Sequence, residues 1–140
     1  MPKEKSVGAI IFTSPPAKFL LLHYQGNHWG FVKGHPLEGE FENQALFREL
    51  EEETGIKESS VELIPGFKET ISYFFKSKGE TIFKEVSFFL LKSNTGKVKI
   101  SSEHNDFKWL SFEEAVELAT HKTAKDLLSK ASSKIQTLNH

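Results

Sequence analysis

The sequence predicts an α/β or α+β domain in which a mixed β-sheet lies between helices. Short runs of β-branched and aromatic residues alternate with stretches whose apolar residues recur at helical spacing, a pattern typical of layered domains. The chain has 140 residues, of which 38% are hydrophobic, and thirteen phenylalanines supply large apolar side chains. That length suffices for a sizeable core, so we expect a single domain over residues 1–140.

The first part of the chain predicts three strands and one helix. Apolar runs predict strands over Val7–Thr13, Phe19–Tyr24 and Trp29–Val32. Pro15 and Pro16 mark the turn between the first two runs. Helical spacing then predicts a helix over Phe41–Thr54, and Gly55 follows as its C-terminal stop.

The second part of the chain predicts a long hairpin followed by two helices. The expected strands are Val61–Ile64, Phe67–Phe75, Thr81–Lys92 and Phe107–Leu110. Gly79 lies in the turn that joins the two longest of them. Ser111 is a plausible N-cap for a helix from Phe112 to about Thr120, and helical spacing resumes from Lys122.

Composition argues against several classes of function. The net charge of −1 and the lack of an extended basic stripe favour a small-molecule substrate over a nucleic-acid or membrane surface. The absence of cysteine excludes disulfides, thiolate nucleophiles and zinc–thiolate sites. No apolar run approaches the ~20 residues of a membrane span, and the first five residues lead into no signal-peptide pattern. We therefore expect a reducing, cytoplasmic setting.

The most informative segment reads GHPLEGEFENQALFRELEEETGI and runs from Gly34 to Ile56. Seven carboxylates surround Arg48, the only arginine of the chain. Arg48 stands four residues before Glu52 and can therefore fix the rotamer of that carboxylate. Gly34 and Gly39 suit a loop whose backbone passes close to a ligand.

Three glutamates of this segment project from one side of the expected helix. Glu49, Glu52 and Glu53 lie within an arc of about 100°, because each helical residue advances about 100°, whereas Leu46 and Leu50 point elsewhere and can anchor the helix. Carboxylates this close raise each other's pKa values, and a divalent cation relieves the repulsion. Mg²⁺ prefers oxygen ligands shared with substrate phosphates, so the face predicts phosphoanhydride hydrolysis. The alternative is a solvated acidic face with no role.

The full spacing from Gly34 to Ile56 resembles the 23-residue signature of the Nudix hydrolases. These are metal-dependent enzymes that cleave a nucleoside diphosphate linked to another moiety. The resemblance implies an αβα sandwich, with Mg²⁺ or Mn²⁺ bound by Glu49, Glu52 and Glu53. It also implies that Glu49 is a candidate general base, whereas Arg48 has a structural role.

Other segments are similar to the asymmetric diadenosine tetraphosphate hydrolases, which split that substrate into ATP and AMP by water attack. The similar segments are His28–His35, Gly66–Glu69 with Tyr73, and Ser102–Leu110 before the helix that starts at Phe112. The resemblance implies that Lys33 and His35 contact the phosphate chain, with His28 near it. Lys84 is a further candidate for the phosphates, and Tyr73 for stacking on an adenine.

Two more positions complete the resemblance. Glu103 stands where the family has a further acid from a distant loop, a candidate metal ligand or base. His121 stands where many relatives have an aromatic residue that clamps adenine. The expected roles make physical sense, because a tetraphosphate carries about four negative charges and stacking on a ring contributes about 1–3 kcal/mol.

Two alternatives stay open at this point. The first is a Nudix hydrolase of another substrate, such as the 5′ end of RNA, an oxidised nucleoside triphosphate or a nucleotide sugar. The second is a catalytically silent Nudix domain that binds a nucleotide. The retention of every glutamate of the signature favours an enzyme over the silent domain.

Overall fold

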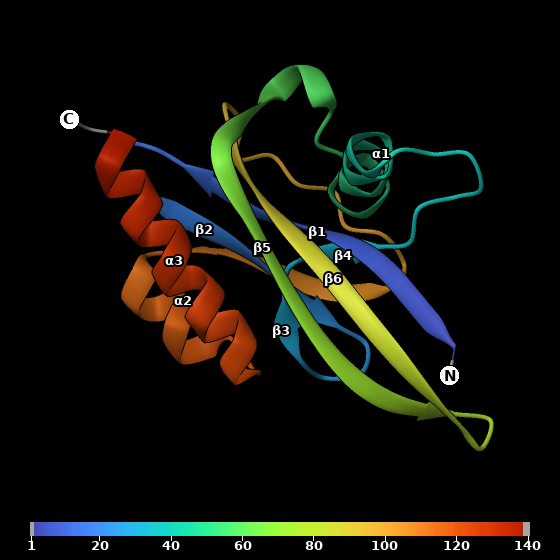
Figure 1. Cartoon of the computed structure of the whole chain (residues 1–140). Helices are drawn as coiled ribbons and strands as arrows, with labels where there is room; N and C mark the ends of the chain where they lie inside the picture. Colours follow the sequence, from blue (N-terminus) through green and yellow to red (C-terminus); the bar gives the residue numbers. More distant parts are fainter. Residues whose placement is uncertain (1, 139–140) are drawn as a thin grey trace.

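The computed structural model describes residues 2–138, which form a mixed sheet with helices on both sides. The elements are β1 (Lys3–Thr13), β2 (Lys18–Tyr24), β3 (Trp29–Gly30), β4 (Val32–Gly34), α1 (Glu42–Thr54), a 3₁₀ turn (Glu58–Ser60), β5 (Val61–Ser77), β6 (Glu80–Ser93), β7 (His104–Leu110), α2 (Phe112–Leu118) and α3 (Lys122–Leu138). The sheet order is β3-β2-β1-β6-β5, with β4 paired to β1 and β7 paired to β2. Helix α1 lies on one side of the sheet, and α2 and α3 lie on the other (Figure 1).

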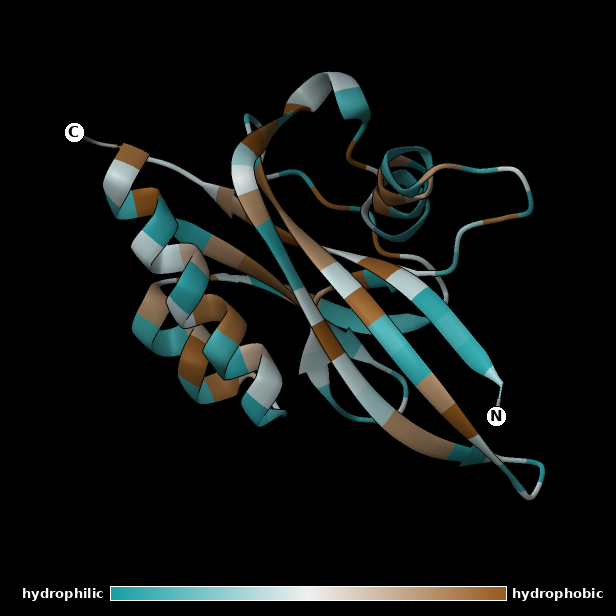
Figure 2. Ribbon diagram, viewed as in Figure 1, coloured by the Kyte–Doolittle hydropathy of each residue, from teal (hydrophilic) through white to brown (hydrophobic). Residues whose placement is uncertain are grey.

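The hydrophobic core has two layers because alternate residues of a strand face opposite sides of the sheet. Ile10 of β1 belongs to the cluster that contains Leu128 of α3. Its neighbour Ile11 belongs to the cluster that contains Leu46 and Leu50 of α1. Bands of hydrophobic and hydrophilic residues alternate along β5 and β6 in Figure 2. The predicted arrangement of a mixed sheet between helices is therefore confirmed.

Strand β5 differs from the prediction, because the separate strands expected over Val61–Ile64 and Phe67–Phe75 form one continuous strand. The pairing of β5 with β6 shifts register between Leu63 and Lys68. Gly66 lies inside this irregular stretch and has a φ of 82°, a backbone conformation that residues with a side chain rarely adopt. The break that the sequence signals at Pro65 and Gly66 is thus a bulge within a strand rather than a strand end.

The hairpin of β5 and β6 carries the sheet well past the other strands (Figure 1). The hairpin pairs antiparallel out to Ser77 and Glu80, with Lys78 and Gly79 at positive φ in the turn. Strand β1 runs parallel to β6 and starts at Lys3, four residues earlier than expected. Polar residues at the start of β1 hide this extension from the sequence pattern.

The expected strand over 29–32 is two short strands separated at Phe31. β3 pairs with β2 through Leu22 and Gly30, whereas β4 pairs with β1 through Gly8 and Lys33. The chain therefore crosses from one neighbour to another at Phe31, and this crossing carries Lys33 toward the middle of the sheet.

The last two helices begin where the sequence predicts. Ser111 caps α2: its Oγ accepts from the backbone N–H of Glu114, whose carboxylate accepts from the Ser111 N–H in return. The α2 helix ends at Leu118, two residues before the predicted Thr120, because Ala119 adopts a non-helical ψ of 130°. Within residues 2–138, no helix is long and apolar enough to cross a membrane.

Candidate active site

Strand β4 ends with a glycine that lies directly against helix α1. Gly34 pairs with Val7 of β1, and a Cβ at Gly34 would overlap the carboxylate of Glu49. A larger residue would therefore have to displace Glu49 or move the strand. Gly55 closes the other end of the segment: its φ of 75° ends α1, and its N–H donates to the Glu51 carbonyl at 2.8 Å.

Arg48 connects the loop to the acidic face of α1. Its Nε and Nη2 donate to the two oxygens of Glu40 at 2.8 and 3.0 Å. Nη1 donates to Glu49 at 2.9 Å and to Glu52 at 3.2 Å, and Nη2 also donates to the His35 carbonyl at 2.9 Å. These hydrogen bonds raise the pKa of Arg48, and those to Glu40 have the largest effect. The guanidinium fork therefore holds two of the three candidate carboxylates together.

The third candidate, Glu53, faces inward and is only 3% exposed. Its Oε1 lies 3.3 Å from Nε2 of His104, a fully buried side chain at the start of β7. Within the described part of the chain, both oxygens of Glu53 and Nε2 of His104 lack a hydrogen-bond partner. Buried polar atoms in native proteins nearly always have one. These three atoms therefore indicate a place where a cation or a water molecule binds.

Burial raises the pKa of Glu53 to about 9, and the neighbouring Glu49 and the charge of Glu103 add to the effect. Glu103 comes from the turn just before β7, far from α1 in the sequence. Its effect on Glu53 shows that the fold brings the fourth predicted acid toward the other three. Without a cation, the Glu53 carboxyl group therefore favours its protonated form more than an ordinary carboxyl group does.

No three acidic or histidine side chains of residues 2–138 are already grouped as a complete set of metal ligands. The donors nevertheless suit a hard divalent cation, because they are carboxylate oxygens and because Glu53 has two buried oxygens without partners. A cation would also relieve the burial and repulsion that raise the pKa of Glu53. The residues present therefore fit the expected metal.

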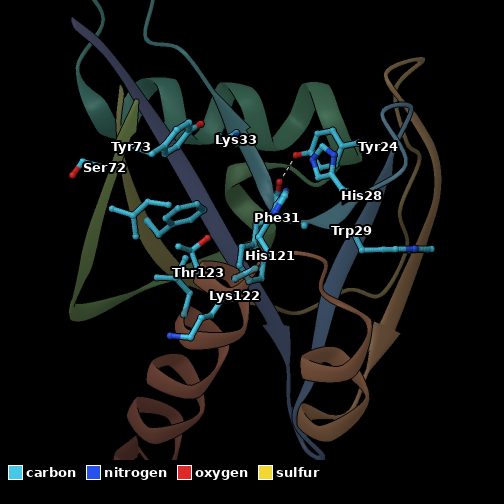
Figure 3. Close-up of a pocket in the computed structure, with 15 residues that line it drawn as sticks. Tyr24, His28, Trp29, Phe31, Lys33, Ser72, Tyr73, His121, Lys122 and Thr123 are labelled. Carbon is cyan, nitrogen blue, oxygen red and sulfur yellow. Dashed lines mark hydrogen bonds between the residues drawn. The ribbon is translucent and has the colours of Figure 1, made fainter. Parts of the chain in front are cut away.

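A cavity of about 520 Å³ opens between the sheet and the start of α3. Such a volume is in the range of small-molecule sites, roughly 300–1,000 Å³. Phe31, Ile71 and Phe88 contribute apolar surface. In Figure 3, Tyr73 lies on one side and the stacked pair Tyr24 and His28 on the other.

Four of the predicted binding residues line this cavity: His28, Lys33, Tyr73 and His121. Burial and then the charge of Lys84 lower the pKa of Lys33, while the charge of Glu53 opposes them. Burial and then His121 lower the pKa of His28. Lys33 and Lys84 are positive groups close to each other, and Lys33 is poorly solvated, so an anion between them is favoured. The cavity therefore combines an apolar surface with a cationic corner near Glu53.

Tyr24 joins the cavity to the carboxylates, although sequence reasoning assigned it no role. Its ring stacks on His28 with centroids 4.4 Å apart and meets His104 edge-on at 4.5 Å. Its hydroxyl donates to the Phe31 carbonyl. Burial and then the charge of Glu53 raise the pKa of Tyr24, so its hydroxyl stays protonated beside the buried acid.

The other predicted binding residues lie outside the cavity lining. Lys84 pairs with Tyr73 across the hairpin and is close enough to affect Lys33. His35 instead contacts β1: its Nδ1 lies 3.2 Å from Ser6 Oγ, and its Nε2 lies 3.5 Å from the Glu4 carboxylate. In this structure His35 is thus held by its own strand neighbours.

Sequence reasoning also missed His104, Lys122 and Thr123, which lie beside Glu53 or line the cavity. His104 directly follows Glu103, so the neighbouring acid was the available signal. Lys122 and Thr123 start α3, and nothing in their local pattern separates them from an ordinary helix start.

The chain belongs to the Nudix family, because a family model of the NUDIX domain matches residues 2–131. This match confirms the family that the segment from Gly34 to Ile56 predicts. Enzymes of this family generally need divalent cations.

Within the family, the chain is similar to the asymmetrical bis(5′-nucleosyl)-tetraphosphatases. It is 35% identical to the one of Caenorhabditis elegans over 133 residues, which cover 91% of this chain and 94% of the relative. It is 34% identical to the one of Mus musculus over 113 residues, which cover 79% of this chain and 76% of that relative. A crystal structure of a C. elegans Ap4A hydrolase binary complex superposes with a TM-score of 0.84 at 32% identity, over 96% of this chain and 98% of that one. The predicted resemblance to asymmetric diadenosine tetraphosphate hydrolases is therefore confirmed.

Proposed function

We propose that this chain is a hydrolase of dinucleoside polyphosphates that splits diadenosine tetraphosphate into ATP and AMP by water attack on a phosphate. One observation carries the proposal: a cavity with aromatic and cationic groups adjoins a buried, unpartnered carboxylate on the Nudix helix. The names of the C. elegans and M. musculus relatives support the choice of substrate.

The cavity suits one nucleoside and the start of a phosphate chain. Tyr73 is 37% exposed, so its ring face is open to an adenine, with His121 lining the same space. Stacking on such a ring contributes about 1–3 kcal/mol. Lys33, with His28 and Lys84 nearby, neutralises phosphate charge at the end close to Glu53. The phosphates therefore lead from the nucleoside toward the acids.

Glu49, Glu52, Glu53 and Glu103 are the residues that would hold the metal, which we expect to be Mg²⁺ or Mn²⁺. When bound, such a cation neutralises phosphate charge and makes a water molecule easier to deprotonate. Glu52 is 57% exposed and Glu49 lies between it and the interior, so this row of carboxylates reaches from solvent to the buried Glu53. Arg48, which also belongs to α1, holds Glu49 and Glu52 in place through hydrogen bonds.

The proton of the attacking water needs an acceptor among the same residues. Glu49 and Glu103 are the two candidates, because Glu52 is largely solvated and Glu53 is buried. The attacking water is easier to deprotonate as the pH rises. We expect activity to rise from neutral to mildly alkaline pH. A pH profile that peaks near pH 5 would contradict the metal–carboxylate mechanism.

Product analysis tests the proposal directly. The protein is incubated with Mg²⁺ and diadenosine tetraphosphate, and the nucleotides are separated by ion-exchange chromatography. Equal amounts of ATP and AMP are expected. Two molecules of ADP per substrate, or no turnover, would overturn the proposal. Reactions in ¹⁸O-labelled water then show which product carries the new oxygen.

A small substrate panel separates the proposal from the other Nudix activities. The panel contains a 5′-triphosphorylated RNA, an oxidised nucleoside triphosphate and a nucleotide sugar. We expect the highest kcat/KM for diadenosine tetraphosphate. A higher value for any other member would reassign the substrate, and tight nucleotide binding without turnover of any member would identify a silent domain. Cell fractionation tests the expected cytoplasmic setting.

A further inference from the structure

A series of polar contacts connects the loop before β7 to the buried carboxylate of α1. The backbone N–H of Glu103 donates to Ser101 Oγ at 3.3 Å, and that Oγ lies 3.1 Å from Nδ1 of His104. On the other side of the imidazole, Nε2 lies 3.3 Å from Oε1 of Glu53. His104 is therefore the only side chain in this series that contacts both elements.

The contacts of Ser101 favour one tautomer of His104. Its Oγ already accepts a hydrogen bond from the Glu103 backbone. Within residues 2–138, the one acceptor within reach of the Ser101 hydroxyl is Nδ1 of His104. A hydroxyl that donates to Nδ1 leaves the ring proton on Nε2. The Nε2–H group is then on the side of the ring that faces Glu53.

The ring of His104 has little freedom to turn away from Glu53. Its side chain is fully buried, and Tyr24 packs against it with centroids 4.5 Å apart and rings at 64°. Nε2 and Glu53 Oε1 are close but not aligned as a hydrogen bond, and neither atom has another partner in the described chain. The 3.3 Å separation is already within hydrogen-bonding distance.

We propose that His104 is a positioning residue for Glu53: its Nε2–H donates to one carboxylate oxygen and thereby directs the other oxygen to the cation. Ser101 supports this role by fixing the tautomer. The inference rests on the proposed function of Glu53 as a metal-binding carboxylate. Residues that orient metal ligands typically contribute about 10–100-fold to metal affinity or activity.

The test is Mn²⁺ binding to the nucleotide-free protein, measured by calorimetry and by the electron paramagnetic resonance signal of free Mn²⁺. His104→Phe keeps a ring against Tyr24 but removes the donor, and we expect Mn²⁺ affinity to fall about 10–100-fold. His104→Gln places an amide N–H near the position of Nε2 and should restore affinity to within about threefold of the wild type. Wild-type affinity in His104→Phe would overturn the inference.

Three further variants make the result specific. Ser101→Ala should weaken Mn²⁺ binding about 3–10-fold, because the tautomer is no longer fixed. If circular dichroism shows that His104→Phe is unfolded, Ser101→Ala provides the test in its place. Unchanged Mn²⁺ affinity in Ser101→Ala would then overturn the inference. His23→Phe is the matched control, since His23 also stacks on an aromatic ring, that of Trp29, and binds Asn27 rather than an acid. Its Mn²⁺ affinity should not change.

Glu53→Gln separates this inference from the proposed function. Weaker Mn²⁺ binding in Glu53→Gln together with normal binding in His104→Phe would overturn the positioning role alone. Equal Mn²⁺ binding by the wild type and Glu53→Gln would instead overturn the metal-binding role of Glu53, on which the positioning role depends.

Discussion

The acidic loop–helix segment and the cavity are built in opposite ways. In the segment from Gly34 to Ile56, Arg48 finds all its partners within thirteen positions of itself along the chain. The cavity brings together residues as distant as Tyr24 and Leu127, and its lining comes from the segment between β2 and β4, from the β5–β6 hairpin and from the start of α3. Local sequence therefore determines the chemistry of the acids, whereas long-range packing determines the shape that a substrate meets.

The two sides of the acidic segment also differ in how many of their polar atoms have hydrogen-bond partners. Glu40, Glu49 and Glu52 all accept bonds from Arg48. Where the segment meets the interior, Glu53 has no hydrogen-bond partner in residues 2–138. The carboxylates on the solvent side of the segment thus have hydrogen-bond partners within the protein. The carboxylate on the inner side gains its partners only when a ligand binds. This difference sets the size of the effect expected from each substitution.

The largest effect is expected from Glu52→Gln. An amide oxygen is a poorer cation ligand than a carboxylate, and several kcal/mol of charge stabilisation in the transition state correspond to a loss of ~10³-fold or more in kcat. Glu52 is largely exposed, so circular dichroism and the melting temperature should stay close to wild type. Steady-state kinetics with Mg²⁺ provide the measurement. A loss below tenfold would show that Glu52 is only an Arg48 partner.

Gly34→Ala should have the next largest effect, because the new Cβ would overlap the carboxylate of Glu49. The end of a flexible side chain can move, so we expect a folded protein with a displaced Glu49. A displacement of about 1 Å near the chemistry can reduce activity about 100-fold. Gly96→Ala is the control, because the nearest atom to a Cβ there, Trp109 Nε1, lies at an ordinary contact distance of 3.9 Å. Equal activity in the two variants would separate Gly34 from the geometry of Glu49.

The sequence predicts the segment well because its contacts join residues that are close along the chain. Its glycines are recognisable because the backbone conformation or a close contact requires them. The contact of Arg48 with Glu52 follows from helix spacing, and the end of α1 follows from Gly55. Tyr24 and His104 could not be found in this way, because their importance depends on β2 pairing with β7. His35 differs, because the resemblance implies a phosphate contact, which stays a prediction, while its observed partners, Ser6 and Glu4, lie on another strand.

Tyr73 tests the cavity without touching the acids. Tyr73→Ala removes the ring and should raise KM for diadenosine tetraphosphate about tenfold, which is within the 1–3 kcal/mol of a base–aromatic stack. Tyr73→Phe keeps the ring and should retain the wild-type KM. In both variants kcat should change little, because Tyr73 belongs to the cavity lining rather than to the carboxylate row. If Tyr73→Phe is as impaired as Tyr73→Ala, the hydroxyl rather than the ring contacts the substrate.

The smallest expected effect, a slope in thermal stability, tests whether the inner side of the segment needs a ligand. The pKa of Glu53 is raised from 4.5 to about 9 in the folded, metal-free protein. Between these values the folded state keeps a proton that the unfolded state has released. The contribution of Glu53 to stability is therefore complete below about pH 4.5 and is lost as the pH rises toward 9.

Glu53→Gln isolates this contribution from the other titrating groups, because its neutral amide does not ionise. With a chelator present, the melting temperature of the wild type should fall more steeply between pH 6 and 9 than that of Glu53→Gln. Saturating Mg²⁺ should remove most of the difference in slope, since a bound cation stabilises the ionised carboxylate. Parallel curves in chelator would mean that Glu53 is already ionised without metal. In that case a group of the protein itself, with His104 the nearest candidate, stabilises the charge of Glu53.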